Sequence, residues 1–254
     1  MTAQKSPETS GLVTDDTLLG GRLCLRQPVD GYRVAVDPVL LAATIPARAG
    51  ERILDVGSGV GAAALCLVYR VPGCQVDGIE IQSDLVAIAL ENAAANGVTD
   101  TVHFIEGNIS TPPTGMRSGS FDHVMTNPPY LQTTESRKPP SSSKAVATIE
   151  QEIDLDSWLS YCIRMTRSRG TVTVVHRADR LDDVVRILST KCGALMVFPL
   201  WPKAGEDAKR VIVRATVGRE TPLRLVPGLI MHEESGDYTP AAQAILCAAA
   251  TLEV

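Results

Sequence analysis

Residues 52–69 read RILDVGSGVGAAALCLVY. The short run Arg52–Val56 carries the apolar residues Ile53, Leu54 and Val56, which predicts a buried strand, and the Ala-rich run Ala62–Tyr69 predicts a helix. Between them the glycine turn Gly57–Gly61 lets the backbone approach a ligand closely. A strand, a glycine turn and a helix in this order are typical of an open α/β sheet that binds a nucleoside-containing ligand.

The same alternation of strands and helices continues towards the C-terminus. The further strands that we expect are 75–81, 102–106, 121–126, 171–176, 195–200 and 210–217. The further helices that we expect are 83–96, 156–169, 179–191 and a last one from Pro240, after the cap residue Thr239. This alternation predicts an α/β fold with a doubly wound, mostly parallel sheet of seven strands. Ligands of such sheets bind at the carboxyl ends of the strands.

The N-terminal part predicts a small β-hairpin before this core. A Gly-Gly pair and an Asp-Gly pair are hairpin signals, and Asp37-Pro38 resembles a helix N-cap followed by the first helical residue. The expected organisation is a flexible segment, 1–16, and one domain, 17–254, made of a hairpin and helix, 17–50, and a sheet core, 51–254.

Composition and charge narrow the class of protein. Hydrophobic residues make up 44% of the chain, enough for a sizeable core. The formal net charge of -5 argues against a protein that coats nucleic acid, although a local basic rim stays compatible with it. The six cysteines form no C-x-x-C pair, so we expect free thiols in a reducing cytoplasm and no metal site. No apolar run is long enough for a membrane span.

Polar residues near three strand ends predict a cofactor site. Asp55 lies just before the glycine turn, and Glu80, near the end of the next strand, could accept hydrogen bonds from ribose hydroxyls. Asn108, after the third strand, could pair with an adenine edge. The turn also fits a loose dinucleotide fingerprint, which leaves NAD open. Asp55 favours S-adenosylmethionine, because a carboxylate there would repel a pyrophosphate and suits an ammonium group.

The tetrapeptide Asn127-Pro128-Pro129-Tyr130 follows the strand 121–126 and predicts the chemistry. Two consecutive prolines fix an extended turn. The Asn127 amide oxygen and the Pro128 carbonyl can then both accept from one –NH₂ group. A planar amine is a poor nucleophile, and two such acceptors favour a pyramidal nitrogen whose lone pair faces an activated methyl group. Tyr130 could stack on a planar substrate.

Together, the two motifs resemble the N-P-P-Y class of methyltransferases, which modify adenine-N6, guanine-N2 of ribosomal RNA or glutamine-N5 of release factors. From about Asp15 to the C-terminus, the chain is most similar to the bacterial enzymes that methylate adenine-N6 in valine tRNA, in the anticodon loop. The segments that carry this resemblance are Asp30–Arg33, Asp37–Ala43, Asp55–Gly61, Asn127–Tyr130 and Asp237–Pro240.

The resemblance implies a Rossmann-like methyltransferase fold, S-adenosylmethionine as methyl donor, S-adenosylhomocysteine as product and tRNA as partner. The expected catalytic residues are Asn127, Pro128 and Tyr130. The expected cofactor-binding residues are Asp55, Gly57, Ser58, Gly59, Gly61, Glu80, Ile81, Asn108, Ile109 and Asn127. The expected substrate-binding residues are Tyr32, Arg33, Asp37, Arg137 and Lys138. One departure is Asn108, whose position is often an aspartate in the family.

Several alternatives stay open from the sequence. Release-factor methyltransferases usually carry a helical N-terminal domain, whereas about fifty residues with hairpin signals precede Asp55 here. Guanine-N2 methylation of ribosomal RNA would use the same tetrapeptide. An NAD oxidoreductase or a non-catalytic binder lacks support, because no residue pair suited to hydride chemistry is apparent. A phosphate-binding rim could include Arg22, Arg26, Arg33, Arg137, Lys138 and Lys144, which could equally be solvated surface. We expect a monomer, with a dimer left open.

Overall fold

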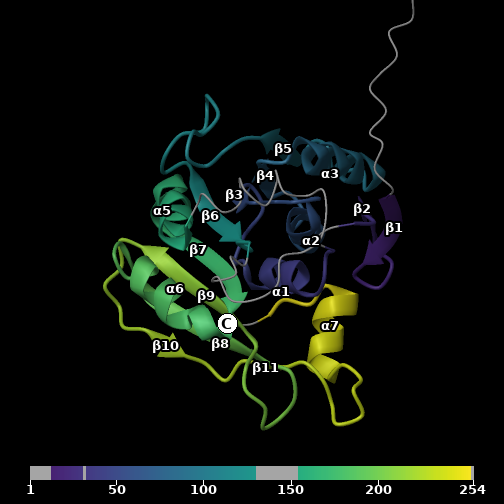
Figure 1. The fold of residues 1–254 in the computed structure, drawn as a ribbon. Coiled ribbons are helices and arrows are strands. Elements are labelled where there is room, and N and C mark those ends of the chain that lie inside the picture. The colour runs from purple at the N-terminus through teal and green to yellow at the C-terminus, as the bar shows by residue number, and fades with distance from the viewer. Residues whose placement is uncertain (1–12, 31–32, 130–153, 253–254) are drawn as a thin grey trace, which may run out of the picture.

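The computed structural model describes residues 13–30, 33–129 and 154–252 (Figure 1). Its strands are β1 Val13–Leu18, β2 Leu23–Pro28, β3 Arg52–Val56, β4 Gln75–Glu80, β5 Val102–Glu106, β6 Phe121–Thr126, β7 Thr166–Arg177, β8 Cys192–Trp201, β9 Arg210–Val217, β10 Arg224–Leu225 and β11 Leu229–Ile230. Its helices are α1 Asp37–Thr44, α2 Ala62–Arg70, α3 Ser83–Ala95, α5 Leu155–Met165, the 3₁₀ turn Ala178–Arg180, α6 Leu181–Leu188 and α7 Pro240–Ala248.

The main sheet confirms the predicted doubly wound, mostly parallel fold. The strand order is β10-β8-β9-β7-β6-β3-β4-β5, and β11 also pairs with β8. Only β9 runs antiparallel to its neighbours β7 and β8. The sheet therefore contains nine strands instead of seven, because β10 and β11 are two-residue strands that are too short to show a periodic pattern. The strand order reverses between β3 and β6, where a ligand crevice is expected.

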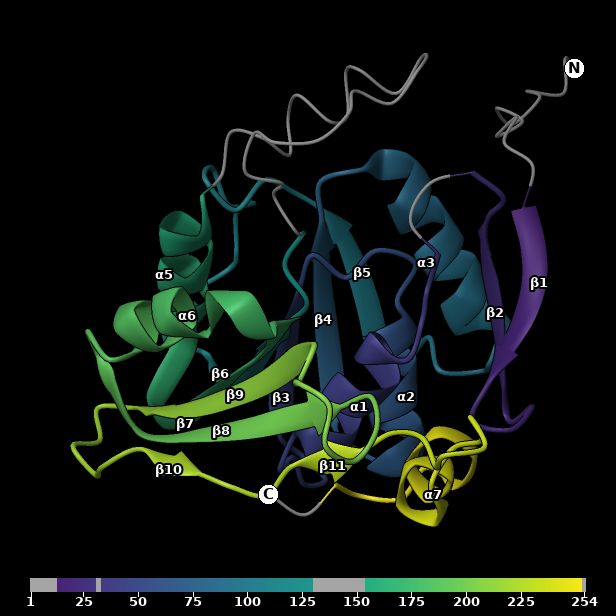
Figure 2. The ribbon, with the colours of Figure 1, turned by 60° about the horizontal axis from the view of Figure 1, so that its bottom comes forward.

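Helices cover both faces of this sheet (Figures 1 and 2). Alternate strand residues point to opposite faces, so Ile53 joins the hydrophobic cluster under α1, α2, α3 and α7, whereas its neighbour Leu54 joins the cluster under α5 and α6. The β1–β2 hairpin lies at the outer side of α3 and contributes Leu23 and Leu25 to the first cluster. No helix of the described residues is both long and apolar enough to cross a membrane.

The N-terminal boundaries differ from the sequence prediction. The hairpin begins at Val13 rather than after residue 16, because Val13–Leu18 pairs along its whole length with Leu23–Pro28. Helix α1 begins at Asp37, and its N-cap is Val36. Asp37 is therefore the first helical residue and not the cap, and its carboxylate pairs with Arg210 of β9 instead (3.2 Å).

The region around β7 also differs. Helix α5 was expected to reach Arg169 but ends at Met165, and β7 begins at Thr166. The Thr166 hydroxyl donates to the Cys162 carbonyl and so closes the helix (2.8 Å). Arg167 then pairs with Asp122 of β6, which holds the chain in the sheet (2.6 Å). Helix α6 spans Leu181–Leu188 instead of the expected 179–191, and the Asp179 carboxylate before it pairs with Arg177.

Candidate active site

The strand register brings the predicted polar residues to one edge of the sheet. Val56, the last residue of β3, pairs with Ile79 of β4 on one side and with Thr126 of β6 on the other. The glycine turn therefore starts between Glu80 and Asn127, each of which follows a residue paired with Val56. The sheet places these two predicted site residues beside the turn, as their positions at strand ends predicted.

The glycines of the turn have two different tasks. Gly57, Gly59 and Gly61 all have positive φ angles, of 72°, 54° and 86°. A Cβ on Gly61 would lie 2.4 Å from Phe104 Cζ, and one on Gly57 would lie 2.8 Å from Trp158 Cζ2. Gly57 and Gly61 thus admit close packing of two rings. A Cβ on Gly59 would meet no atom of the described residues within 4 Å, so this glycine faces open space.

The N–H groups of the turn are largely taken up by the protein itself. The Gly57 and Ser58 N–H groups both donate to the Ile79 carbonyl (2.8 and 3.1 Å). The Gly59 N–H donates to Glu80 Oε2 (2.9 Å), and the Gln82 N–H donates to Glu80 Oε1 (3.0 Å). This geometry disfavours a pyrophosphate ligand, which needs free N–H groups and no carboxylate beside them. The Glu80 carboxylate is instead held rigidly, with further lone pairs available as acceptors.

Asp55 is the most perturbed carboxylate of the site. Its side chain is only 2% exposed, and burial raises its pKa to about 7, an effect that the neighbouring Glu80 charge increases and a hydrogen bond from the Ala64 N–H opposes. Within the described residues, Asp55 Oδ2 and the nearby Ser58 Oγ are buried without a hydrogen-bond partner. An unsatisfied carboxylate oxygen and a nearby unsatisfied hydroxyl fit a cationic donor such as the ammonium group of S-adenosylmethionine.

The end of β6 is fixed by two hydrogen bonds in series. The Trp158 indole N–H donates to the Thr126 hydroxyl, which donates to the Val56 carbonyl of β3 (both 2.8 Å). Thr126 is fully buried, and Pro128 is buried beyond it. The turn at Asn127 is thereby anchored to the strand that carries the glycine turn. No sequence pattern indicated that Trp158 and Thr126 would form this connection.

The remaining predicted cofactor residues lie at the β4 and β5 ends. Asn108 Oδ1 accepts from the Ser110 N–H (2.8 Å), which fixes the plane of its amide. Ile109 is 7% exposed, and Ile81 follows Glu80 and is half-buried. Among the predicted site residues, Tyr32, Tyr130, Arg137 and Lys138 lie outside the described residues.

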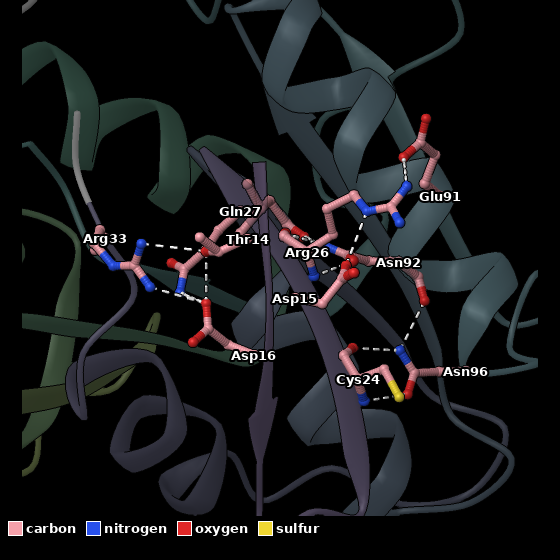
Figure 3. Close-up of polar contacts among 11 residues, drawn as sticks. Thr14, Asp15, Asp16, Cys24, Arg26, Gln27, Arg33, Glu91, Asn92 and Asn96 are labelled. Atoms are coloured by element: carbon pink, nitrogen blue, oxygen red, sulfur yellow. Dashed lines mark hydrogen bonds and ion pairs between the residues drawn. The ribbon is translucent and has the colours of Figure 1, made fainter. Parts of the chain in front are cut away.

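The N-terminal arginines are engaged within the protein (Figure 3). Arg33 pairs with Asp16 (2.9 Å) and donates to Thr14, and Arg26 pairs with Asp15 and Glu91 (3.0 Å each). Arg22, outside that view, donates to the Leu19 and Cys247 carbonyls. These contacts favour a structural role over the phosphate-binding rim that the sequence left open for them.

Comparison with known proteins shows which family the chain is similar to. The family model "Methyltransferase small domain" matches residues 34–141. A protein of Aeromonas hydrophila named tRNA1(Val) (adenine(37)-N6)-methyltransferase is 30% identical over 209 residues, which are 82% of this chain and 85% of that protein. A protein of the same name from Porphyromonas gingivalis is 27% identical, over 82% of this chain and 84% of its own. A release factor glutamine methyltransferase of Chlorobaculum tepidum is 34% identical but covers only 38% of this chain.

Among solved structures, a predicted O-methyltransferase of Agrobacterium tumefaciens superposes with a TM-score of 0.68 at 23% identity, covering 82% of this chain and 94% of its own, which shows the fold. Fold and site together define an S-adenosylmethionine-dependent methyltransferase, and an NAD oxidoreductase is set aside. More narrowly, the chain belongs to the family of the tRNA1(Val) (adenine(37)-N6)-methyltransferases.

Proposed function

We propose that this enzyme transfers a methyl group from S-adenosylmethionine to the exocyclic N6 amine of an adenine in the anticodon loop of valine tRNA. The observation that carries the proposal is the position of Asn127 and Pro128, which follow β6 directly beside the glycine turn of β3. The similarity to tRNA1(Val) enzymes spans most of both chains, whereas the similarity to a release factor enzyme is confined to a part. An anticodon-loop base is also already single-stranded, which lowers the cost of placing it in a pocket.

Each side chain has a role that follows from its chemistry. Bound S-adenosylmethionine supplies an electrophilic methyl group on a sulfonium. Asp55 and Ser58 would hold its ammonium end, Glu80 its ribose hydroxyls and Asn108 its adenine. The Asn127 amide oxygen and the Pro128 carbonyl would accept the two hydrogens of the target amine and direct its lone pair at the methyl carbon.

Methyl transfer of this kind requires no prior deprotonation. The N–C bond forms as the C–S bond breaks, the sulfur keeps the electron pair, and the nitrogen becomes acidic only then and loses its proton. His176 at the end of β7 is not suited as a general base. It is 4% exposed, and burial, together with the Arg180 charge, lowers its pKa to about 4. The acceptors at Asn127 and Pro128 thus provide the main electrostatic assistance.

A methylation assay with a panel of substrates tests this function. The purified protein is incubated with labelled S-adenosylmethionine and, separately, valine tRNA, valine tRNA with guanine in place of the target adenine, ribosomal RNA and a release factor. We expect label only in the valine tRNA that keeps the target adenine, recovered as N6-methyladenosine by nucleoside mass spectrometry. Label in the release factor or in guanine would overturn the proposal.

The Asn127→Ala variant tests the catalytic role of the Asn127 amide. Deleting one preorganised acceptor should lower kcat roughly a hundredfold or more, because such groups contribute about 3–4 kcal/mol to the transition state. Thermal unfolding should stay close to that of the wild type, since Asn127 is partly exposed beyond the end of β6. Near-normal turnover would remove Asn127 from the catalytic role.

A further inference from the structure

A buried asparagine outside the predicted site contacts the cofactor turn. Asn92 of α3 is 1% exposed. Its Oδ1 accepts from the Arg26 N–H (2.7 Å), and its Nδ2 donates to the Arg26 carbonyl (2.9 Å), as Figure 3 shows. The same Nδ2 also donates to the carbonyl of Val60 in the glycine turn (2.9 Å). One amide therefore joins strand β2 of the hairpin to the turn of the cofactor site.

A second asparagine repeats only half of this arrangement. Asn96 lies one helical turn further along and contacts Cys24 of β2 in the same way. The Cys24 N–H donates to Asn96 Oδ1 (3.0 Å), and Asn96 Nδ2 donates to the Cys24 carbonyl (2.8 Å). The remaining Asn96 hydrogen bond goes back to the Asn92 carbonyl within the same helix (2.8 Å). Helix α3 and its C-cap residue Asn96 thus hold β2 by two side-chain amides, of which only Asn92 reaches the glycine turn.

The Val60 carbonyl needs a fixed partner because of its neighbours. Val60 is 5% exposed and stands between Gly59 and Gly61, whose backbones are the least restrained by side chains. The N–H side of the turn is held by Ile79 and Glu80, as described above. Asn92 holds the carbonyl side. A buried carbonyl left without a donor would be costly, so the turn would shift if this bond were lost.

Hydrogen bonds and an ion pair also connect the hairpin to the segment that precedes α1. Gln27, next to Arg26, is 4% exposed, and its Oε1 accepts from the Val34 N–H (2.9 Å). Its Nε2 donates to Asp16, which also pairs with Arg33 (2.8 and 2.9 Å; Figure 3). The docked hairpin is therefore bonded both to the cofactor turn, through Asn92, and to the segment that precedes α1.

We propose that Asn92 is a positioning residue for cofactor binding: it makes the shape of the glycine turn depend on the docked β1–β2 hairpin. This inference rests on the proposed cofactor site at that turn. Asn92 itself touches no reacting atom. This coupling has two consequences. The hairpin, although far from the glycine turn in sequence, contributes to affinity for S-adenosylmethionine, and cofactor binding stabilises the docked hairpin.

The test compares Asn92→Ala with Asn96→Ala. Each variant loses one of the two clamps on β2, so each should show a lower Tm. Asn96→Ala keeps the Asn92 bonds to Arg26 and to the Val60 carbonyl, whereas Asn92→Ala leaves that carbonyl without its donor. Calorimetric titration with S-adenosylhomocysteine should give a Kd about tenfold or more higher for Asn92→Ala, with little change for Asn96→Ala. Equal weakening in both variants, or no weakening in either, would overturn the proposal. A wild-type chain that binds no S-adenosylhomocysteine would instead refute the cofactor site itself.

Hydrogen exchange keeps the proposal testable if Asn92→Ala does not fold. In the wild-type protein, saturating S-adenosylhomocysteine should slow exchange in a peptide covering β2, especially at the Arg26 amide that bonds to Asn92. Unchanged exchange throughout β2, with protection confined to the glycine turn, would show that the hairpin is not coupled to the cofactor.

Discussion

Asp55 illustrates how a single side chain can be unfavourable for folding and useful for binding. A carboxyl group buried beside Glu80 resists ionisation, which is why its pKa is raised to about 7. A cationic ligand group would reverse that effect by favouring the ionised form. Since the folded-state pKa of Asp55 lies above the ordinary aspartate value of 3.8, the ligand-free protein loses stability as pH rises from about 4 through about 7.

We therefore expect cofactor affinity to depend on pH through Asp55. Affinity for S-adenosylhomocysteine should rise as pH increases through about 7 and level off above it, since the ionised carboxylate binds the ammonium group. Asp55→Asn should weaken binding, remove this pH dependence and raise the Tm of the ligand-free protein at pH 8. Calorimetry and thermal unfolding across pH 6 to 9 measure both effects. A wild-type affinity independent of pH would contradict the assignment of Asp55.

At the scale of elements, the glycine turn is shaped by the side chains that pack over it. Gly61→Ala would place a methyl group 2.4 Å from Phe104 Cζ and force a positive φ of 86° on alanine. The strain alone costs about 1–2 kcal/mol, and overpacking adds roughly 1–3 kcal/mol. Gly97→Ala is the control, because its φ is also positive (66°) but its Cβ would meet nothing within 4 Å. Urea unfolding should show a clearly larger loss for Gly61→Ala; equal losses would contradict the packing role.

Elements and site residues differ in how far the sequence could predict them. The bounds of β3 and β9 are as predicted, because each is rich in branched apolar residues, follows a charged residue and ends just before a glycine. The starts of β1 and β7 were missed, because residues 14–16 and 166–169 are polar and show no strand pattern. In the structure, β1 pairs with β2 along its whole length, and Thr166 of β7 pairs with Phe121 of β6.

The same distinction applies to the site. Glu80 and Asn127 could be located because strand ends converge at one edge of a parallel sheet. Thr126 and Asn92 could not, since their roles depend on which distant carbonyl lies within reach of each side chain.

For the whole molecule, the distribution of charge limits which groups can contact the phosphates of a tRNA. The net charge is -5, and within the described residues the N-terminal arginines contact carboxylates or carbonyls. A small local set of basic groups must then supply phosphate contacts. If three to six phosphates are neutralised, log Kd for tRNA plotted against log salt concentration should have a slope magnitude of about 2–5. Filter binding at several salt concentrations measures it, and a slope near zero would argue against electrostatic tRNA binding.

The two asparagines of α3 also bear on self-association. The outward N–H and C=O groups of Cys24 and Arg26 form the edge of β2 that faces away from β1. Open strand edges of this kind can recruit a strand from another molecule and start aggregation. Here the amides of Asn92 and Asn96 satisfy these backbone groups in place of a third strand. The β2 edge of the hairpin is thus closed to strand addition at Cys24 and Arg26, since a third strand would have to displace both asparagine amides.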